Sequence, residues 1–430
     1  MTNASNEKFY ENTGLLVPRI YLPKKGTDMT RYAVVACDQF TSSGEYWKRV
    51  DDFVGDSVST LRLTLPEYYL DKEGEQARID KINADMINYL ENGTLEPFDG
   101  LVFVERTQST GAVRKGVVIA LDLEKYDYHK GSKSLVRATE GTVIERIPPR
   151  MKVRKNAAIE LPHVLMLIND AKKTVIEGLE SAKGAAIYDF DLMEGGGSVK
   201  GYAITDNNAI DRFNDGLADL INDNFLYAVG DGNHSFAAAK NHWEELKKQG
   251  APMDHPARFC LCELENINDD GIVFEPIHRV VFDCDIDEFT DALLDFLGVY
   301  GGTIEDDNYD STSVPTADPD KKYHEVRIFS ENRSVVAFID KSFDTLAVGA
   351  VQRFLDDALA GKKIDYVHDT DEVNNTVKAN KGSLGILLPC PEKSSLFEVV
   401  SRGDVLPRKT FSMGDARDKR YYIEARKITM

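Results

Sequence analysis

The stretch from Phe225 to Leu246 carries the clearest chemical potential, because an apolar run there passes directly into a helical pattern. The junction reads Gly230-Asp231-Gly232-Asn233-His234-Ser235. Glycines at 230 and 232 allow a tight turn and let a ligand approach the backbone closely. The first amides of a helix lack partners within the helix, and the positive end of the helix dipole lies behind them. The pattern therefore predicts an anion site that suits a phosphate group.

The side chains of this junction have chemical and structural interpretations that stay open at this point. Asn233 or Ser235 could contact the anion or could serve as the N-cap of the helix. Asp231 could act in catalysis and bind Mg²⁺ together with substrate phosphates, or could stabilise the turn as an Asx-type cap. His234 is a catalytic candidate, although a hydrogen-bonded core imidazole is the commoner role. A metal site at His234 is disfavoured, since no second His or Cys lies within one helical turn.

A second reactive stretch, SLVRATEGTVIERIPPRMKVRKNAAIE, runs from Ser134 to Glu160. Its Thr139-Glu140-Gly141-Thr142 turn places a carboxylate between two hydroxyls, and Arg146 and Arg150 follow. Phosphoryl transfer needs a carboxylate to orient or deprotonate the acceptor hydroxyl and cations to spread the charge of the transferring group. Glu140 fits the first role and the two arginines fit the second, although charge runs are usually solvated faces. Pro148-Pro149 predicts a loop here rather than a continuous helix.

Other polar candidates lie at the ends of predicted strands. Arg279, in FEPIHRVVFD, has the planar fork that suits bidentate phosphate contact, and its neighbour His278 should point to the opposite face of the strand. A surface salt bridge is the alternative for Arg279.

Asp38 directly follows the run YAVVAC. It could lie at a strand end, where α/β folds usually bind ligands, or it could simply begin a loop. Glu194 to Ser198 lacks the GxxxxGK[ST] pattern and predicts a hairpin tip; no GxGxxG, GxSxG or HExxH occurs.

These candidates must be positioned by alternating helices and strands, which predicts a mixed α+β fold. In the first two thirds we expect strands at 32–38, 163–170 and 227–231, a hairpin of 101–108 and 112–123, and helices at 45–54, around 79–90, and at 235–249. In the last third we expect a helix at 286–297, a hairpin of 325–330 and 334–340, a helix before Gly361, and an apolar run at 384–389.

Length and composition indicate a globular protein of two or three domains or of one heavily elaborated domain. The 430 residues are 42% hydrophobic, and 52 basic against 72 acidic residues leave a net charge of -20. This charge disfavours nucleic acid and acidic membrane surfaces as partners. Five scattered cysteines suit buried thiols in a reducing compartment, and neither a signal-like start nor an apolar run near ~18 residues is present. We therefore expect a cytoplasmic location, while the oligomeric state stays open.

Three regions are predicted along the chain. They are an N-terminal α/β lobe at 1–205 that carries the Thr139 to Thr142 turn, a region at 206–303 with the strand-to-helix junction and Arg279, and a C-terminal α/β region at 304–430. The segment Glu305 to Lys321 is the best linker or surface-loop candidate, because it is rich in Asp, Ser, Thr and Pro. The segment Asp206 to Asn224 is a weaker boundary.

The sequence also resembles known proteins. GDGNHSFAAAK resembles the DG-x-H motif of the ParB/sulfiredoxin superfamily, which includes free-serine kinases and holds nucleotide phosphates at this turn. Nearly end to end, the chain resembles a bacterial family of unknown function, through VVACDQF, RATEGTVIERIPPR, GDGNHSFAAAK, FEPIHRVV and LPRKTFSMG. The resemblance implies a ParB/sulfiredoxin-like core element in a larger, multi-lobed chain and adds the basic pair Arg408-Lys409 to the binding candidates. Ser235 departs from the many related motifs that carry Arg after the His, so a phosphate-binding guanidinium must come from elsewhere.

Together these features predict a phosphotransferase that moves a phosphoryl group between a nucleotide or pyrophosphate and a small hydroxylated metabolite. The superfamily resemblance suggests serine as acceptor and raises Glu140 as the base, while ATP, ADP or pyrophosphate would be the donor and Mg²⁺ the metal. Phosphomonoester hydrolysis and a non-catalytic, nucleotide-responsive regulator are the alternatives. If the protein is an enzyme of this kind, we expect the side chains of Glu140, His234 and Arg279 to converge on one cleft, into which the start of the helix opens.

Overall fold

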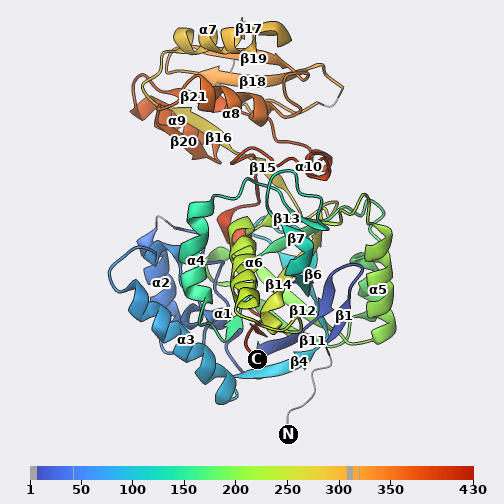
Figure 1. Cartoon of the computed structure of the whole chain (residues 1–430). Helices are drawn as coiled ribbons and strands as arrows, with labels where there is room; N and C mark the ends of the chain where they lie inside the picture. The colour runs from blue at the N-terminus through green and yellow to red at the C-terminus, as the bar shows by residue number, and fades with distance from the viewer. Residues whose placement is uncertain (1–6, 42, 308–312, 319) are drawn as a thin grey trace. The chain divides into compact units, whose positions relative to one another are not determined.

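A computed structural model describes residues 7–41, 43–307, 313–318 and 320–430. The chain divides into two compact units. Unit 1 extends to Ile272 and takes in residues 400–404 and 414–430, whereas unit 2 consists of 273–399 and 405–413. Unit 2 is thus largely an insertion between two parts of unit 1. Figure 1 shows the elements of each unit with their labels.

Among the described residues, unit 1 contains a mixed sheet of eleven strands. Nine of them follow the order β11-β12-β5-β6-β14-β10-β13-β8-β7, while β2 pairs with β6 and β1 pairs with β2. The pairs β10/β14, β13/β8 and β7/β8 are parallel, and the others are antiparallel. The strands are β1 (Lys8–Tyr10), β2 (Leu15–Val17), β5 (Leu101–Thr107), β6 (Val113–Asp122), β7 (Tyr126–Asp127), β8 (Val136–Ala138), β10 (Leu165–Ile168), β11 (Ala186–Asp191), β12 (Ser198–Ile204), β13 (Tyr227–Asp231) and β14 (Phe259–Asn266).

Smaller elements complete unit 1. Two further ladders pair β3 (Arg19–Pro23) with β4 (Leu95–Asp99) and β9 (Ile159–Glu160) with β23 (Arg426–Lys427). The helices are α1 (Met29–Tyr32), α2 (Gly44–Val54), α3 (Glu75–Glu91), α4 (Ile147–Arg154), α5 (Asn207–Asp219) and α6 (Asn233–Lys248). None of the helices among the described residues combines the length and apolarity that crossing a bilayer requires.

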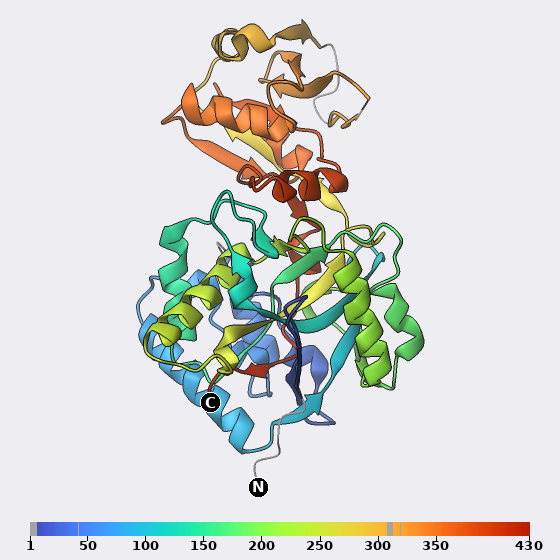
Figure 2. The ribbon, with the colours of Figure 1, turned by 45° about the vertical axis from the view of Figure 1, so that its right-hand side comes forward.

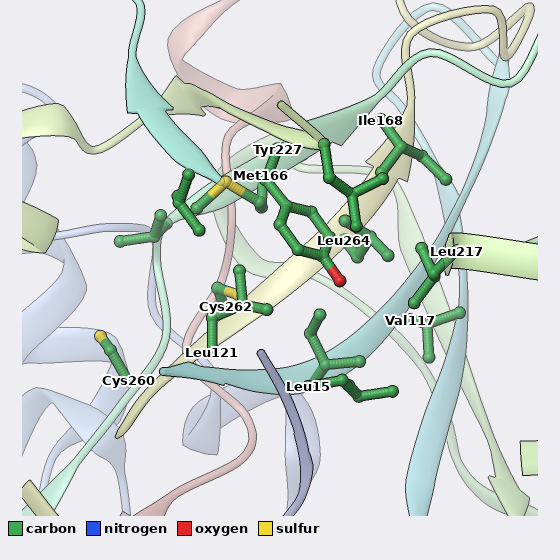
Figure 3. Close-up of a cluster of buried hydrophobic side chains, with 14 of the residues drawn as sticks. Leu15, Val117, Leu121, Met166, Ile168, Leu217, Tyr227, Cys260, Cys262 and Leu264 are labelled. Carbon is green, nitrogen blue, oxygen red and sulfur yellow. The ribbon is translucent and has the colours of Figure 1, made fainter. Parts of the chain in front are cut away.

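The sheet of unit 1 is buried on both faces, as the alternation along β5 shows. Leu101 and Phe103 join a core cluster with apolar residues of α5 and α6, whereas Val102 and Val104 join a second cluster with α2 and with Tyr421 to Ile423 near the C-terminus. This is the period of two that a strand imposes on its side chains. Figure 3 shows part of the first cluster, where the Tyr227 ring lies among Met166, Leu264 and other apolar side chains.

Unit 2 is built on a second sheet, which is antiparallel throughout its described strands. Its order is β17-β19-β18-β21-β16-β20, and the short strands β15 and β22 pair where the chain enters and leaves the unit. The strands are β15 (Phe274–Pro276), β16 (His278–Val281), β17 (Gly302–Asp306), β18 (Tyr323–Phe329), β19 (Ser334–Asp340), β20 (Ile364–Val367), β21 (Leu384–Leu387) and β22 (Phe411–Met413). The helices are α7 (Ile286–Leu297), α8 (Ala347–Asp357), α9 (Thr370–Ala379) and α10 (Lys393–Ser401).

The predicted fold class, mixed sheets with flanking helices, is confirmed, but two local predictions are wrong. The run 32–38 does not form a sheet strand: Tyr32 ends α1, and Val35 makes an isolated bridge to Tyr421. Pro148 and Pro149 do not prevent a helix but lie in the first turn of α4. Proline is tolerated there, because the amides of the first turn have no partner within the helix in any case.

The division of the chain also differs from the predicted borders at 205 and 303. β12 and β13 lie on either side of residue 205 yet belong to one sheet, and β17 spans residue 303. The weaker boundary at 206–224 is largely helix α5. The predicted linker 305–321 begins inside β17 and lies within unit 2, and its residues 308–312 and 319 fall outside the described residues.

The segment after unit 2 crosses the interior of unit 1 through buried ion pairs. Arg420 pairs with Glu263 of β14 and with Glu424, and all three side chains are at most 3% exposed. Arg426 lies 3.1 Å from Glu160, which also pairs with Arg154 of α4. Figure 2 shows this last, red segment entering the strands of unit 1. Glu263, and in part Glu160, thus have their cations in residues that follow unit 2 in the chain.

Replacing Arg420 by methionine should destabilise unit 1 strongly. Arg420→Met leaves Glu263 and Glu424 buried without their cation, so we expect the free energy of unfolding to fall by about 3–5 kcal/mol. Both tryptophans, Trp47 and Trp243, belong to unit 1, so tryptophan fluorescence during urea unfolding reports this unit alone. Lys81, whose side chain is 70% exposed in its pair with Asp85, provides the control, because Lys81→Met should cost no more than about 0.5 kcal/mol. Equal effects of the two substitutions would contradict the assigned role of Arg420.

Candidate functional site

The junction between β13 and α6 has the geometry of an anion site. β13 ends at Asp231, and α6 begins at Asn233 with Gly232 as its N-cap in the left-handed region (φ 82°, ψ 26°). No side chain among the described residues caps this helix, and the Asp231 carboxylate accepts the Gly232 amide at 2.9 Å. Phe236, Ala239 and Trp243 anchor α6 in the core. The helix therefore presents its first-turn amides, with the positive end of its dipole, from a fixed position.

Gly232 is needed for space as well as for conformation. A Cβ atom at this position would lie 3.1 Å from Val164 Cγ2, 3.2 Å from Val164 Cα and 3.4 Å from His163 Cδ2. The segment that leads into β10 therefore packs directly against the start of α6. His163 is brought to the helix start by this close approach.

The loop that carries Glu140 is tied to the same helix start. The Thr139 amide donates to Asn233 Oδ1 at 3.2 Å, Asn233 Nδ2 donates to Thr139 Oγ1 at 3.2 Å, and the Val143 amide donates to His234 Nε2 at 3.2 Å. Asn233 and His234 thus hold the loop in place. Glu140 is half-buried within it. Close by in the sequence, Thr142 has a buried hydroxyl without a hydrogen-bond partner in the described structure, and Arg146 is exposed.

Cations surround the carboxylates at the helix start. Lys419 Nζ lies 3.2 Å from Asp231 Oδ2, and the Lys419 side chain is only 9% exposed. Burial on its own would raise the pKa of the nearby Asp38 carboxyl. In the acidic range where Asp38 titrates, a protonated His163, a 3.0 Å hydrogen bond from Gln39, and the charges of Lys419 and Arg150 outweigh burial and bring the pKa of Asp38 below its usual range. Asp38 is therefore held in its ionised form.

A second carboxylate, Glu67, forms an ion pair with Arg150 of α4. Glu67 lies on a short 3-10 helix, η2 (Glu67–Tyr69). Burial raises the pKa of Glu67 and the charge of Asp38 raises it further, whereas Arg150 opposes both effects. Asp38 and Glu67 are thus two carboxylates whose pKa values shift in opposite directions, a pattern that is frequent where proton transfer takes place.

A cavity of about 140 Å³ lies beside the first turn of α6. Its polar lining comes from Thr64, Glu67, Arg150, Arg154, Glu160, His163, Ser235 and Tyr422, and most of the rest is aliphatic. Sites for drug-sized ligands occupy roughly 300–1,000 Å³, so this cavity has room for a small metabolite or for one part of a larger ligand.

The structure brings together most of the residues that the sequence singled out, within unit 1. Arg150 and Ser235 share the cavity, Asp38 lies close to Arg150 and Lys419, and the Glu140 loop is bound to Asn233 and His234. Three predicted residues lie in unit 2 instead: Arg279, Arg408 and Lys409.

Arg279 is fully buried inside unit 2 and is occupied there. Its guanidinium donates to the carbonyl oxygens of Ile277, Arg408 and Lys409 and to the side chain of Gln352. Arg408 pairs with Asp356. A guanidinium enclosed in this way cannot reach a ligand without leaving its partners within unit 2.

Asp231 is the residue from which the sequence predicts Mg²⁺ binding at the start of α6. Across the described residues, no group of three or more His, Cys, Asp or Glu side chains is arranged to hold a metal ion. Asp231 already accepts an amide with Oδ1 and faces Lys419 with Oδ2. Both oxygens of this single carboxylate thus have partners, so an ion bound here would take most of its ligands from phosphate oxygens and not from the protein.

Four residues of the site were not predicted: Glu67, His163, Lys419 and Tyr422. Each belongs to a stretch without a motif, and each reaches the site through contacts between distant parts of the chain. Only His163 carried a sequence signal, since it directly precedes the apolar run Val164 to Ile168.

Comparison of the sequence with models of known protein families identifies the family of this chain. The family model described as "Protein of unknown function (DUF1015)" matches residues 21–358, so the chain belongs to this family, as predicted. No curated protein matches the chain.

The solved structures that resemble the chain are distant. One is a conserved hypothetical protein from Pyrococcus furiosus, with 12% identity and a TM-score of 0.35 over 73% of this chain and 95% of that chain. A free serine kinase in complex with AMP has 12% identity and a TM-score of 0.38 over 73% and 91% of the two chains. SbnI with C-terminal truncation from Staphylococcus aureus has 9% identity and a TM-score of 0.35 over 71% and 82%.

Substitution of Gly232 should destabilise unit 1 by more than its φ angle alone explains. Gly232→Ala introduces a Cβ at positive φ and 3.2 Å from backbone, whereas Gly250→Ala, just past the end of the same helix, has a φ of +94° and nothing within 4 Å. We expect about 1 kcal/mol for Gly250→Ala and about 2–3 kcal/mol for Gly232→Ala. Urea unfolding followed by tryptophan fluorescence measures both. If the two variants lose the same stability, the close approach of the His163–Val164 segment is not a constraint.

Proposed function

For this member of the DUF1015 family, we propose that unit 1 is a phosphotransferase that moves a phosphoryl group between a phosphorylated donor and a small hydroxylated metabolite. The observation that carries the proposal is the convergence of an uncapped helix start, Lys419, Arg150 and two carboxylates of opposite pKa shift in one region of unit 1. Catalysis of this reaction is mainly positioning and electrostatic stabilisation, which such a cluster supplies.

The donor phosphates would bind at the start of α6. The amides of the first helical turn supply donors, and Lys419 supplies a nearly buried positive charge beside them. Arg150, at 15% side-chain exposure on the wall of the cavity, supplies a second cation. The net charge of the chain is -20, so this positive region would be a local exception that favours an anionic ligand.

The acceptor hydroxyl would face a carboxylate. Asp38 is ionised and close to both Lys419 and Arg150, so it can orient the hydroxyl and receive its hydrogen bond. Glu140, the base predicted from the sequence, lies in the loop bound to Asn233 and His234 and is the second candidate for this role. ATP, ADP or pyrophosphate would be the donor, and Mg²⁺ bound by Asp231 and phosphate oxygens would neutralise charge on the phosphates.

The size of the cavity favours a small acceptor. About 140 Å³ suits a metabolite with few atoms, and serine, suggested by the sequence resemblance, is one of that size. With water in place of the hydroxyl, the same residues would support phosphomonoester hydrolysis. A regulator that binds nucleotides without turnover is the third possibility.

A transfer assay distinguishes these functions. Purified protein is incubated with Mg²⁺, each donor and a panel of hydroxylated metabolites, and phosphate transfer is followed by mass spectrometry. We expect transfer to one acceptor, and Asp38→Asn or Glu140→Gln to lower kcat about 10²–10⁴-fold while donor binding persists. Asp270→Asn, at a carboxylate that is 97% exposed, is the matched control and should leave kcat unchanged. Release of free phosphate without an acceptor favours the hydrolase, and donor binding without consumption favours the regulator.

Donor affinity should depend on Lys419 in particular. Lys419→Met removes the nearly buried cation at the helix start, so we expect the Kd of the donor to rise about 10- to 100-fold in calorimetric titrations. Lys427→Met removes the same charge from an exposed position on the same segment and should change the Kd by less than about twofold. Equal losses in both variants would assign the effect to net charge rather than to a phosphate contact.

A further inference from the structure

The hydroxyl of Tyr422 links the C-terminal segment to the wall of the cavity. Tyr422 is 2% exposed, and its Oη accepts the Cys37 amide at 3.1 Å. The same oxygen lies 2.8 Å from Nδ1 of His163. The Cys37 thiol is the other side chain that interacts with this hydroxyl.

The proton of this hydroxyl has two possible acceptors. A buried hydroxyl proton that is left without an acceptor costs about 1–3 kcal/mol, so it must point to one of them. Sulfur of a thiol is a weak acceptor, whereas an unprotonated imidazole nitrogen is a good one. The Tyr422 proton is therefore best placed on His163 Nδ1, which puts the single hydrogen of a neutral imidazole on Nε2.

Nε2, the other ring nitrogen of His163, is a buried polar atom at the wall of the cavity. Among the described residues this atom is buried and has no hydrogen-bond partner, although His163 lines the cavity. Its covalent neighbour Cδ2 lies 3.4 Å from the position of a Cβ on Gly232, so Nε2 lies near the N-cap of α6. A protonated imidazole would also carry a hydrogen on Nε2. Only the Nδ1–H tautomer would remove it, and that tautomer would leave the Tyr422 proton to the thiol.

We propose that Tyr422 is a positioning residue that fixes His163 in its Nε2–H form, and that this N–H donates a hydrogen bond to an anionic oxygen of the ligand beside the start of α6. His163 is then a ligand-binding donor and not the proton acceptor of the reaction, which leaves that role to a carboxylate. The assignment of the tautomer stands on the contacts of Tyr422 alone. The identity of the oxygen as a phosphate oxygen rests on the proposed function.

The tautomer can be read directly by nuclear magnetic resonance on protein with ¹⁵N-labelled histidine. The chain has 8 histidines, and loss of one signal set in His163→Asn assigns His163. We expect the shift pattern of an Nδ1 acceptor and an Nε2–H donor in the wild-type protein. Tyr422→Phe should shift His163 toward a mixture of tautomers, and Cys37→Ala, which removes the weaker acceptor, should not change it.

Tyr421→Phe is the matched control for the loss of a buried tyrosine hydroxyl. Tyr421 is also 2% exposed and donates to the Met193 carbonyl at 3.2 Å, but it does not line the cavity. This variant should retain the wild-type pattern of His163. An Nδ1–H tautomer in the wild-type protein, or equal effects of the two tyrosine substitutions, overturns the proposal.

The donor role is tested by calorimetric titration with pyrophosphate. The amide of a glutamine can replace the Nε2–H of histidine, whereas the shorter asparagine cannot reach that position. We expect His163→Asn to weaken binding about tenfold or more and His163→Gln to weaken it by less than about threefold. Equal losses in the two variants overturn the donor role. The tautomer experiment needs no turnover, so failure of the transfer assay and failure of this inference are separate results.

Discussion

The structure of unit 1 depends on the pairing of buried carboxylates with arginines that arrive late in the chain. Glu263 lies in the middle of the sheet, on β14, and Glu424 lies beside it; both share Arg420. Isolated charges of this kind cost several kcal/mol each, so neither carboxylate is tolerable without its cation. The segment from Gly414 onward is therefore an internal part of unit 1, although unit 2 separates it from the rest in sequence.

This constraint also builds the candidate site. Lys419 and Tyr422 flank Arg420 in the chain, so the ion pairs that bury Arg420 also place an ammonium group beside Asp231 and a hydroxyl beside His163. α6 provides the other half of the site, since its apolar face fixes the first turn against the sheet. The candidate site thus lies between the first turn of α6 and the buried segment around Arg420.

The sequence predicted the elements whose signals are local. The bounds of α7 match the predicted 286–297, because Asp285 caps the helix and Gly298 ends it. α6, the hairpin of β5 and β6, and the Asp231 to Ser235 junction were also recognised from local patterns. Residues 32–38 were assigned to a sheet because their apolar run resembles a strand, whereas their actual partner is a segment some 385 residues away. Glu67, His163 and Lys419 were missed for the same reason, since no local pattern encodes a contact between distant segments.

The position of unit 2 in the chain has a consequence for the biogenesis of the protein. A ribosome must translate residues 273–413 after it has completed β14 and before it reaches Lys419 and Arg420. At roughly 5–20 residues per second, this delay is on the order of ten seconds. During that time the nascent sheet has Glu263 without its arginine, so unit 2 can complete its own fold before unit 1 receives its final segment.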